Sequence, residues 1–193
     1  MEGIKAFLKR KNIEISAKRY GIDALGAMAQ GLFASLLIGT IINTVGTQFG
    51  IDFLTQAVVT VGSGEKAVAY TVGGLASAMS GPAMACAIGY ALQAPPLVLF
   101  SLITVGFASN ALGGAGGPLA VLFVAILAAE AGKAVSKETK VDILVTPLVT
   151  IFVGVALSAW WAPAIGKAAS SIGGIIMWAT ELQPFFMGIV LSV

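Results

Sequence analysis

Apolar segments long enough to cross a lipid bilayer follow one another from Gly21 to Val193, and most charged residues lie between them or near the ends. One span needs about 20 apolar residues. The 193-residue chain is 58% hydrophobic and 10% charged, whereas a soluble domain has about 25% charged residues. These features predict a multi-pass protein of the cell membrane, with the lipid bilayer as its main partner.

The spans are expected to be helices rather than barrel strands. Strands of a membrane barrel alternate polar and apolar residues, whereas residues 32–42 and 119–129 are apolar on every side. The predicted fold class is therefore all-α, a polytopic helical bundle of about six spans with broken or re-entrant helices.

Residues 1–19 differ from the rest of the chain because they hold six basic residues: Lys5, Lys9, Arg10, Lys11, Lys18 and Arg19. Their spacing with Phe7 and Leu8 predicts an amphipathic helix on the membrane surface. Basic segments next to spans stay in the cytoplasm. We therefore expect a cytoplasmic N-terminal segment, residues 1–19, followed by a transmembrane domain, residues 20–193.

The predicted spans are residues 21–44, 66–92, 97–112, 118–131, 143–161 and 172–193. Residues 49–61 are too short to cross and are expected to be re-entrant or interfacial. Gly81 and Pro82 interrupt the second span, which is either kinked or split into two half-helices. The last span has no polar end, so we expect it to be cut within a longer protein.

The predicted connections are a glycine loop at residues 113–117, a charged loop at 132–142 and a turn at 162–171. Four spans precede the charged loop if residues 49–61 do not cross. The two basic regions then lie on the same, cytoplasmic side.

A faint internal repeat is also visible. Residues 51–62 resemble 141–154, and residues 66–74 resemble 167–174. Many carriers build a central site from such repeats, but segments rich in Gly, Ala and Val also match by chance. A true repeat would conflict with the count of spans, so both interpretations stay open.

The absence of histidine removes the usual catalytic arrangements and imidazole metal ligands. We expect neither an enzyme nor a metal or cofactor site. A net charge of +2 without a basic stripe gives no sign of nucleic-acid binding. The single Cys86 lies in an apolar run and is expected to be a packing residue.

Acidic residues in apolar runs are the first site candidates, because burying a charge in a bilayer is costly. Glu130 and Glu181 are either ligand-binding or interfacial. Asp142 is expected to cap a helix first and to bind a ligand second. Asp52 and Gln56 are expected to share one helix face, which makes them a stronger pair.

Two segments of small residues are further candidates. The loop 110–118, NALGGAGGP, either gathers backbone amides around an anion or makes a tight turn. Ser77, Ser80 and Gly81 provide close helix packing, and their hydroxyls could also line a substrate path beside Pro82.

Three strings, NALGGAGGPLAV, KETKVDILVTPLVT and ELQPFFMGIVLSV, resemble a known family. This is the second type of enzyme IIC-like membrane domain, found in phosphotransferase-system sugar permeases and in PfoR-like regulators. The resemblance covers nearly the whole chain after residue 20. It implies a membrane permease and directs attention to Asn110, residues 113–117, Asp142, Pro147, Glu181 and Pro184.

The sequence therefore predicts a permease for a small polar solute, bound where helices break near the middle of the membrane. The alternative is a membrane sensor or regulator that transports nothing and uses residues 1–19 to reach a partner. A homo-oligomer is compatible with either function. Coupling to phosphorylation is in doubt, because no phosphoryl-accepting histidine is present and Cys86 lies within a span.

Overall fold

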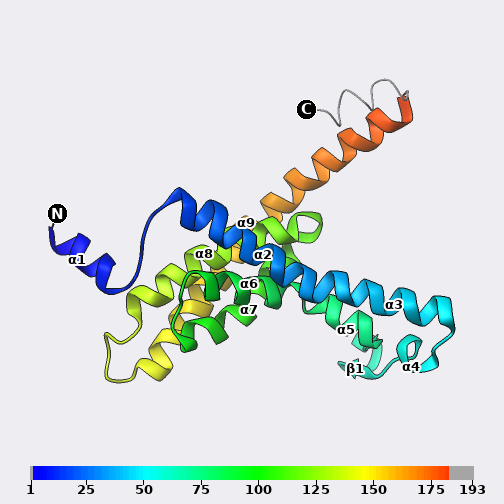
Figure 1. Cartoon of the computed structure of the whole chain (residues 1–193), viewed down its shortest axis with the longest axis horizontal. Coiled ribbons are helices and arrows are strands. Elements are labelled where there is room, and N and C mark those ends of the chain that lie inside the picture. The colour runs from blue at the N-terminus through cyan, green and yellow to red at the C-terminus, as the bar shows by residue number, and fades with distance from the viewer. Residues whose placement is uncertain (1, 183–193) are drawn as a thin grey trace.

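The structure, a computed structural model, describes residues 2–182 and is mostly helical (Figure 1). Its helices and strands, in chain order, are α1 Glu2–Arg10, η1 Lys18–Asp23, α2 Ala24–Leu32, η2 Phe33–Leu37, α3 Ile38–Phe49, α4 Asp52–Thr55, β1 Val59–Val61, η3 Gly64–Lys66, β2 Val68–Tyr70, α5 Val72–Ala78, α6 Ser80–Ala91, α7 Pro96–Gly113, η4 Gly114–Gly116, α8 Gly117–Val135 and α9 Asp142–Leu182.

Three helical stretches within residues 2–182 are long and apolar enough to cross a membrane. They are Lys18–Phe49, Pro96–Val135 and Asp142–Ile172. The pair α5 and α6 adds a fourth candidate, bent by 50° at Met79. The predicted multi-pass helical architecture is confirmed at this level, whereas the number of six spans is not.

The stretch Pro96–Val135 is a hairpin of two helices, α7 and α8. Val98, near the start of α7, lies against Gly132, near the end of α8. Gly114 makes the turn between them with a φ of +49°, a backbone conformation that glycine adopts without a steric penalty. Pro96 and Pro118 stand in the first turns of the two helices, where the missing proline N–H costs no hydrogen bond.

The core lies where α6, α7 and α8 pack together, with α2 and α9 around them. Its fully buried side chains include Met84, Ile88, Leu102, Val105 and Val124. Large apolar side chains also point outward, among them Phe33, Phe100, Phe123, Phe152 and Trp160. Exposed apolar surface on this scale is expected of a face that contacts lipid.

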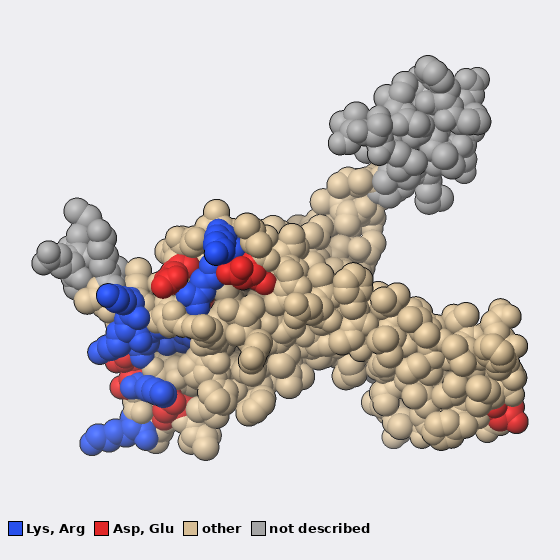
Figure 2. Space-filling view, viewed as in Figure 1, with Lys and Arg blue, Asp and Glu red and all other residues tan. Residues whose placement is uncertain are grey.

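The Lys and Arg side chains visible in Figure 2 gather at one end of the bundle, together with several carboxylates. The N-terminal segment, the α6–α7 turn and the α8–α9 loop meet there, because Arg10 pairs with Glu138 and the Asn12 amide donates a 2.6 Å hydrogen bond to Oε1 of Gln93. The two basic regions therefore lie at the same end of the molecule.

The structure corrects several predicted elements. Residues 59–61 and 68–70 form an antiparallel β-hairpin, with Val59 opposite Tyr70, so the fold is not purely α-helical. The expected turn at residues 162–171 is helical, because α9 continues through Pro163. Close packing holds this part of α9 in place, since Gly116 lies against Ile165. Beyond that contact α9 leaves the bundle (Figure 1, orange to red).

The proposed internal repeat is wrong. Residues 51–62 contain a single helical turn and a strand, whereas residues 141–154 begin the long helix α9. Residues 66–74 include strand β2, and residues 167–174 lie within α9. Both similarities come from common small and β-branched residues, whose local structure is decided by what they pack against.

The N-terminal segment differs from the predicted surface helix, because it is a short helix followed by chain that contacts the bundle. Helix α1 ends at Arg10, and Asn12 adopts a positive φ of 55°. The chain that follows is attached to the bundle, because the Arg19 guanidinium donates a 2.8 Å hydrogen bond to the Leu92 carbonyl. The last predicted span can be followed as helix only to Leu182.

Candidate functional site

A break between α5 and α6 places polar groups inside the apolar bundle. Helix α5 begins after Thr71, whose hydroxyl oxygen accepts a 3.0 Å hydrogen bond from the Gly74 N–H and caps the helix. The helix stops at Ala78, and α6 starts at Ser80 after the non-helical Met79. Pro82 lies in the first turn of α6, so the break precedes the proline by three residues.

The elements around the break approach each other through glycines. A Cβ added to Gly39 of α3 would lie 2.5 Å from the Gly73 carbonyl oxygen of α5. A Cβ on Gly81 of α6 would lie 2.6 Å from the Asn110 Cβ of α7. Such distances leave no room for a side chain, and contacts between small residues are a common basis of close helix packing in membranes.

Polar side chains lie next to these close glycine contacts. The Thr71 hydroxyl donates a 2.8 Å hydrogen bond to Oδ1 of Asn43 on α3. The Asn110 amide donates a longer, 3.4 Å hydrogen bond to the Ser80 hydroxyl. We call Asn43, Thr71, Ser77, Ser80 and Asn110 the polar seam.

Ser77 is the exceptional member of the polar seam. Its hydroxyl oxygen is buried and has no hydrogen-bond partner among the described residues. An unpaired buried hydroxyl costs about 1–3 kcal/mol relative to a paired one. By contrast, Ser109 on α7 and Ser158 on α9 satisfy each other at 2.8 Å. Within the described bundle, the polar seam therefore holds a buried side-chain hydroxyl that no protein group satisfies.

The structure separates the acidic candidates from this seam. Asp52 and Gln56 are exposed, and α4 ends at Thr55, so they do not form a pair on one helix face inside the membrane. The expectation that they share one helix face is wrong, because α4 ends at Thr55 and the backbone of Gln56 is extended. Their part in a binding site stays a prediction.

Asp142 is the first residue of α9, where its carboxylate favours the helix dipole as predicted, but the hydrogen bonds it accepts do not come from the free N–H groups of that helix. Its Oδ1 accepts hydrogen bonds of 2.6 Å from the Lys137 N–H and from the Thr146 hydroxyl. These hydrogen bonds attach the loop residue Lys137 to the first turn of α9, so the Asp142 carboxylate has a structural role.

Glu130 is buried at the charged end, and its Oε1 accepts hydrogen bonds of 3.1 Å from Tyr20 and from Lys133. It is therefore part of an ion pair rather than of the polar seam. The Glu181 side chain and Pro184 lie outside the part of the structure that can be described, so the role of Glu181 stays a prediction.

Sequence reasoning identified Ser77, Ser80 and Asn110 but missed Asn43 and Thr71. Asn43 stands in the apolar run IGTIINTVG, and an amide in such a run was the available signal. Thr71 had no such signal, because its role depends on where α5 begins. Among the described residues no group of His, Cys, Asp and Glu side chains has the arrangement of a metal site.

Comparison with known proteins identifies the family. A family model described as "Phosphotransferase system, EIIC" matches residues 22–193, which is most of the chain. No curated protein and no solved structure matches it. The chain therefore belongs to the phosphotransferase-system EIIC family, the membrane components of sugar transport by that system.

Proposed function

We propose that this chain acts as a sugar permease and that the polar seam forms part of the path of the sugar. The observation that carries the proposal is the buried Ser77 hydroxyl beside the break of α5 and α6, which has no hydrogen-bond partner within residues 2–182. Carriers place their ligands at broken helices near the middle of the membrane, where backbone and side-chain groups are free to bind.

The chemistry of the seam suits a neutral sugar. Sugar hydroxyls donate and accept hydrogen bonds, and the hydroxyls of Ser77, Ser80 and Thr71 do both. The Asn43 and Asn110 amides add separate donors and acceptors. All five side chains are uncharged, so a neutral polyol can enter without stripping water from a charge.

Ser77→Ala tests this proposal. The purified protein in nanodiscs is titrated with a panel of hexoses, hexitols and disaccharides, and the sugar that binds is then followed in vesicle uptake. Loss of one ligand hydrogen bond is expected to weaken binding about tenfold. Thermal unfolding should be unchanged or slightly improved, because the variant removes an unpaired buried hydroxyl.

Ser101→Ala is the matched control. Ser101 is also a serine within the bundle, but its hydroxyl donates to the Leu97 carbonyl of its own helix at 2.7 Å. This variant should bind sugar normally. Equal binding by wild type and Ser77→Ala would refute the role of the seam.

The function of a sensor that transports nothing is a separate expectation. It predicts that deletion of residues 1–19 abolishes signalling while sugar uptake is absent from the start. Uptake by the wild-type chain would exclude this alternative.

A further inference from the structure

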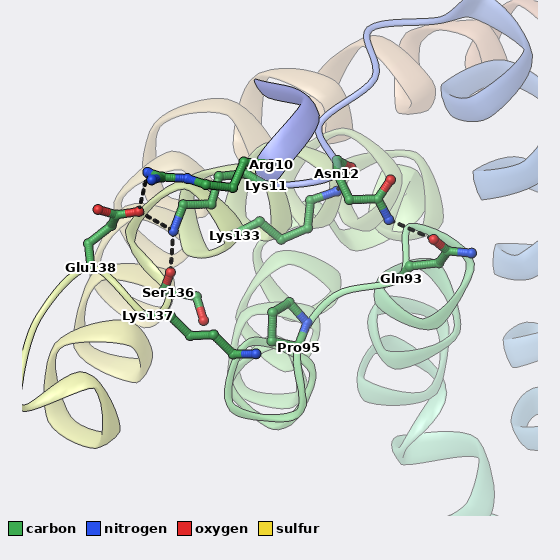
Figure 3. A pocket seen from close by; sticks show the side chains of 9 residues that line it. All are labelled: Arg10, Lys11, Asn12, Gln93, Pro95, Lys133, Ser136, Lys137 and Glu138. Carbon is green, nitrogen blue, oxygen red and sulfur yellow. Dashed lines mark hydrogen bonds and ion pairs between the residues drawn. The ribbon is translucent and has the colours of Figure 1, made fainter. Parts of the chain in front are cut away.

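A pocket of about 390 Å³ opens at the charged end of the bundle (Figure 3). The N-terminal segment forms one wall with Arg10 and Lys11. The end of α8 and the loop after it contribute Lys133, Lys137 and Glu138. The lining thus holds four cations and one carboxylate, although these residues come from segments more than 120 positions apart.

Two of these cations are buried, which is unusual for lysine. The Lys133 side chain is 1% exposed and the Lys11 side chain 8% exposed. Lys133 has no free donor, because its ammonium bonds the carbonyl oxygens of Asn12 and Leu92 and the carboxylate of Glu130. It therefore contributes positive charge to the pocket wall rather than a direct contact.

Lys11 and Arg10 are held by a single carboxylate. Oε1 of Glu138 lies 2.7 Å from the Arg10 guanidinium and 2.5 Å from the Lys11 ammonium. Lys11 also donates to the Ser136 carbonyl. The Lys11 hydrogen bond, assisted by the charges of Arg10 and Lys11, lowers the pKa of Glu138 below its ordinary value of 4.5, against a smaller effect of desolvation. Glu138 is consequently an anion at neutral pH.

Lys137 is the cation without a matching partner. Its backbone N–H is bonded to Asp142, but its exposed side chain makes no hydrogen bond or ion pair among the described residues. Figure 3 shows its ammonium reaching into the pocket beside Pro95. The charged Lys137 ammonium can therefore donate hydrogen bonds to a ligand in the pocket, across from Arg10 and Lys11.

We propose that this pocket binds a phosphate group, presented by a soluble phosphate compound or by an anionic phospholipid. Phosphate carries more charge and more acceptor oxygens than one carboxylate, and guanidinium and ammonium groups are its usual protein partners. The phosphate oxygens would bond Lys137 on one side and Arg10 and Lys11 on the other. The phosphate would thereby displace the Glu138 carboxylate from Arg10 and Lys11.

The phosphate pocket is distinct from the polar seam. Ser80 and Ala91 are the first and last of the 12 residues of α6, and eleven helical rises of 1.5 Å place them about 17 Å apart. The proposal goes beyond sugar passage, and either site can fail its test without affecting the other.

The test titrates the full chain in phosphatidylcholine nanodiscs with inorganic phosphate by calorimetry, at constant ionic strength kept with chloride. Lys137→Gln is expected to weaken phosphate binding about tenfold, because a charge-assisted hydrogen bond is lost. Thermal unfolding without phosphate should be unchanged, since the Lys137 side chain makes no hydrogen bond or ion pair with the residues that the structure describes. Lys140→Gln removes the same charge from the same loop but not from the pocket lining, and should have little effect.

A second variant changes affinity in the opposite direction. Glu138→Gln removes the competing anion and should tighten phosphate binding about three- to tenfold. A merely structural ion pair would not give this result. Phosphate binding no stronger than chloride binding in neutral nanodiscs excludes a soluble phosphate compound as the source.

Nanodiscs containing phosphatidic acid test the lipid source. Native mass spectrometry should then show retained phosphatidic acid on the wild type, less on Lys137→Gln and more on Glu138→Gln. The proposal is overturned if neither inorganic phosphate nor phosphatidic acid distinguishes Lys137→Gln from Lys140→Gln.

Discussion

The ammonium of Lys133 lies 3.0 Å from Oε2 of Glu130, three residues earlier on α8, and the two side chains are 1% and 14% exposed. The same ammonium bonds the Asn12 and Leu92 carbonyl oxygens at 2.9 and 3.2 Å. One side chain therefore joins α8, the N-terminal segment and the end of α6.

This arrangement makes Lys133→Met a severe substitution. It leaves the Glu130 carboxylate buried without its ion-pair partner, and removal of one member of a buried pair costs about 3–5 kcal/mol. The free energy of unfolding of Lys133→Met, measured by denaturant titration in detergent micelles, should therefore be lower than that of the wild type by about 3–5 kcal/mol.

The double variant Glu130→Leu, Lys133→Met is the control. Replacing a whole buried pair with apolar residues is often close to neutral. The double variant should therefore be more stable than Lys133→Met alone. Equal losses in both would show that the carbonyl contacts of Lys133, and not its pairing with Glu130, maintain the fold.

Acidification is expected to release the N-terminal segment. Because the pKa of Glu138 is lower in the folded protein than its ordinary value of 4.5, its contribution is fully present above pH 4.5. It is lost as the pH falls through the lowered folded value, where Arg10 and Lys11 keep their charge but Glu138 does not. A fluorophore on a cysteine replacing Lys9, in a Cys86→Ser background, should show falling anisotropy in that range.

Glu138→Gln provides the comparison for that measurement. The amide does not titrate, so in phosphate-free buffer this variant should show its weaker attachment already at neutral pH and no further step on acidification. A step of equal size in Glu138→Gln would assign the effect to another acidic group, such as Asp142.

The glycine contacts at the helix break give a prediction about stability. Gly81→Ala would place a Cβ 2.6 Å from the Asn110 Cβ, and overpacking of this kind costs about 1–3 kcal/mol. Gly26→Ala on α2 meets no atom within 4 Å. It should leave the unfolding midpoint unchanged or raise it slightly, since alanine favours a helix. Equal midpoints for the two variants would contradict the close approach of α6 and α7.

Much of the fold was predictable because lipid-length apolar runs, prolines and glycines act locally. The limits of α7 and α8 follow from Pro96, Gly114 and Pro118. The long helix α9 was not predictable in this way. Pro163 and the polar residues after it favoured a turn, but packing of residues 165 and 166 against the α7–α8 turn keeps the helix intact. Such contacts join residues distant in sequence and leave no local signal.

The site was predictable only in part for the same reason. Ser77, Ser80 and Asn110 could be named because hydroxyl and amide groups are conspicuous in apolar runs. The burial of Lys133 could not, since it depends on carbonyl oxygens of residues 12 and 92. Because Lys133 lies next to a charged loop in the sequence, and basic residues near loops are usually solvated, the sequence predicts an exposed side chain at this position.

The last prediction concerns the orientation of the charged end. Arg10 contacts Glu138, so Lys9 and Lys140 lie at the same end of the bundle, and basic segments favour the cytoplasm. In a Cys86→Ser background, cysteines replacing Lys9 or Lys140 should react with an impermeant maleimide only after permeabilisation. Both positions are exposed, whereas Ser136 is 4% exposed and a poor site for a label.

A cysteine replacing Ala115, at the exposed turn between α7 and α8, should react in intact cells. Reversal of all three results would place the N-terminus outside, and opposite results at Lys9 and Lys140 would contradict the contact itself.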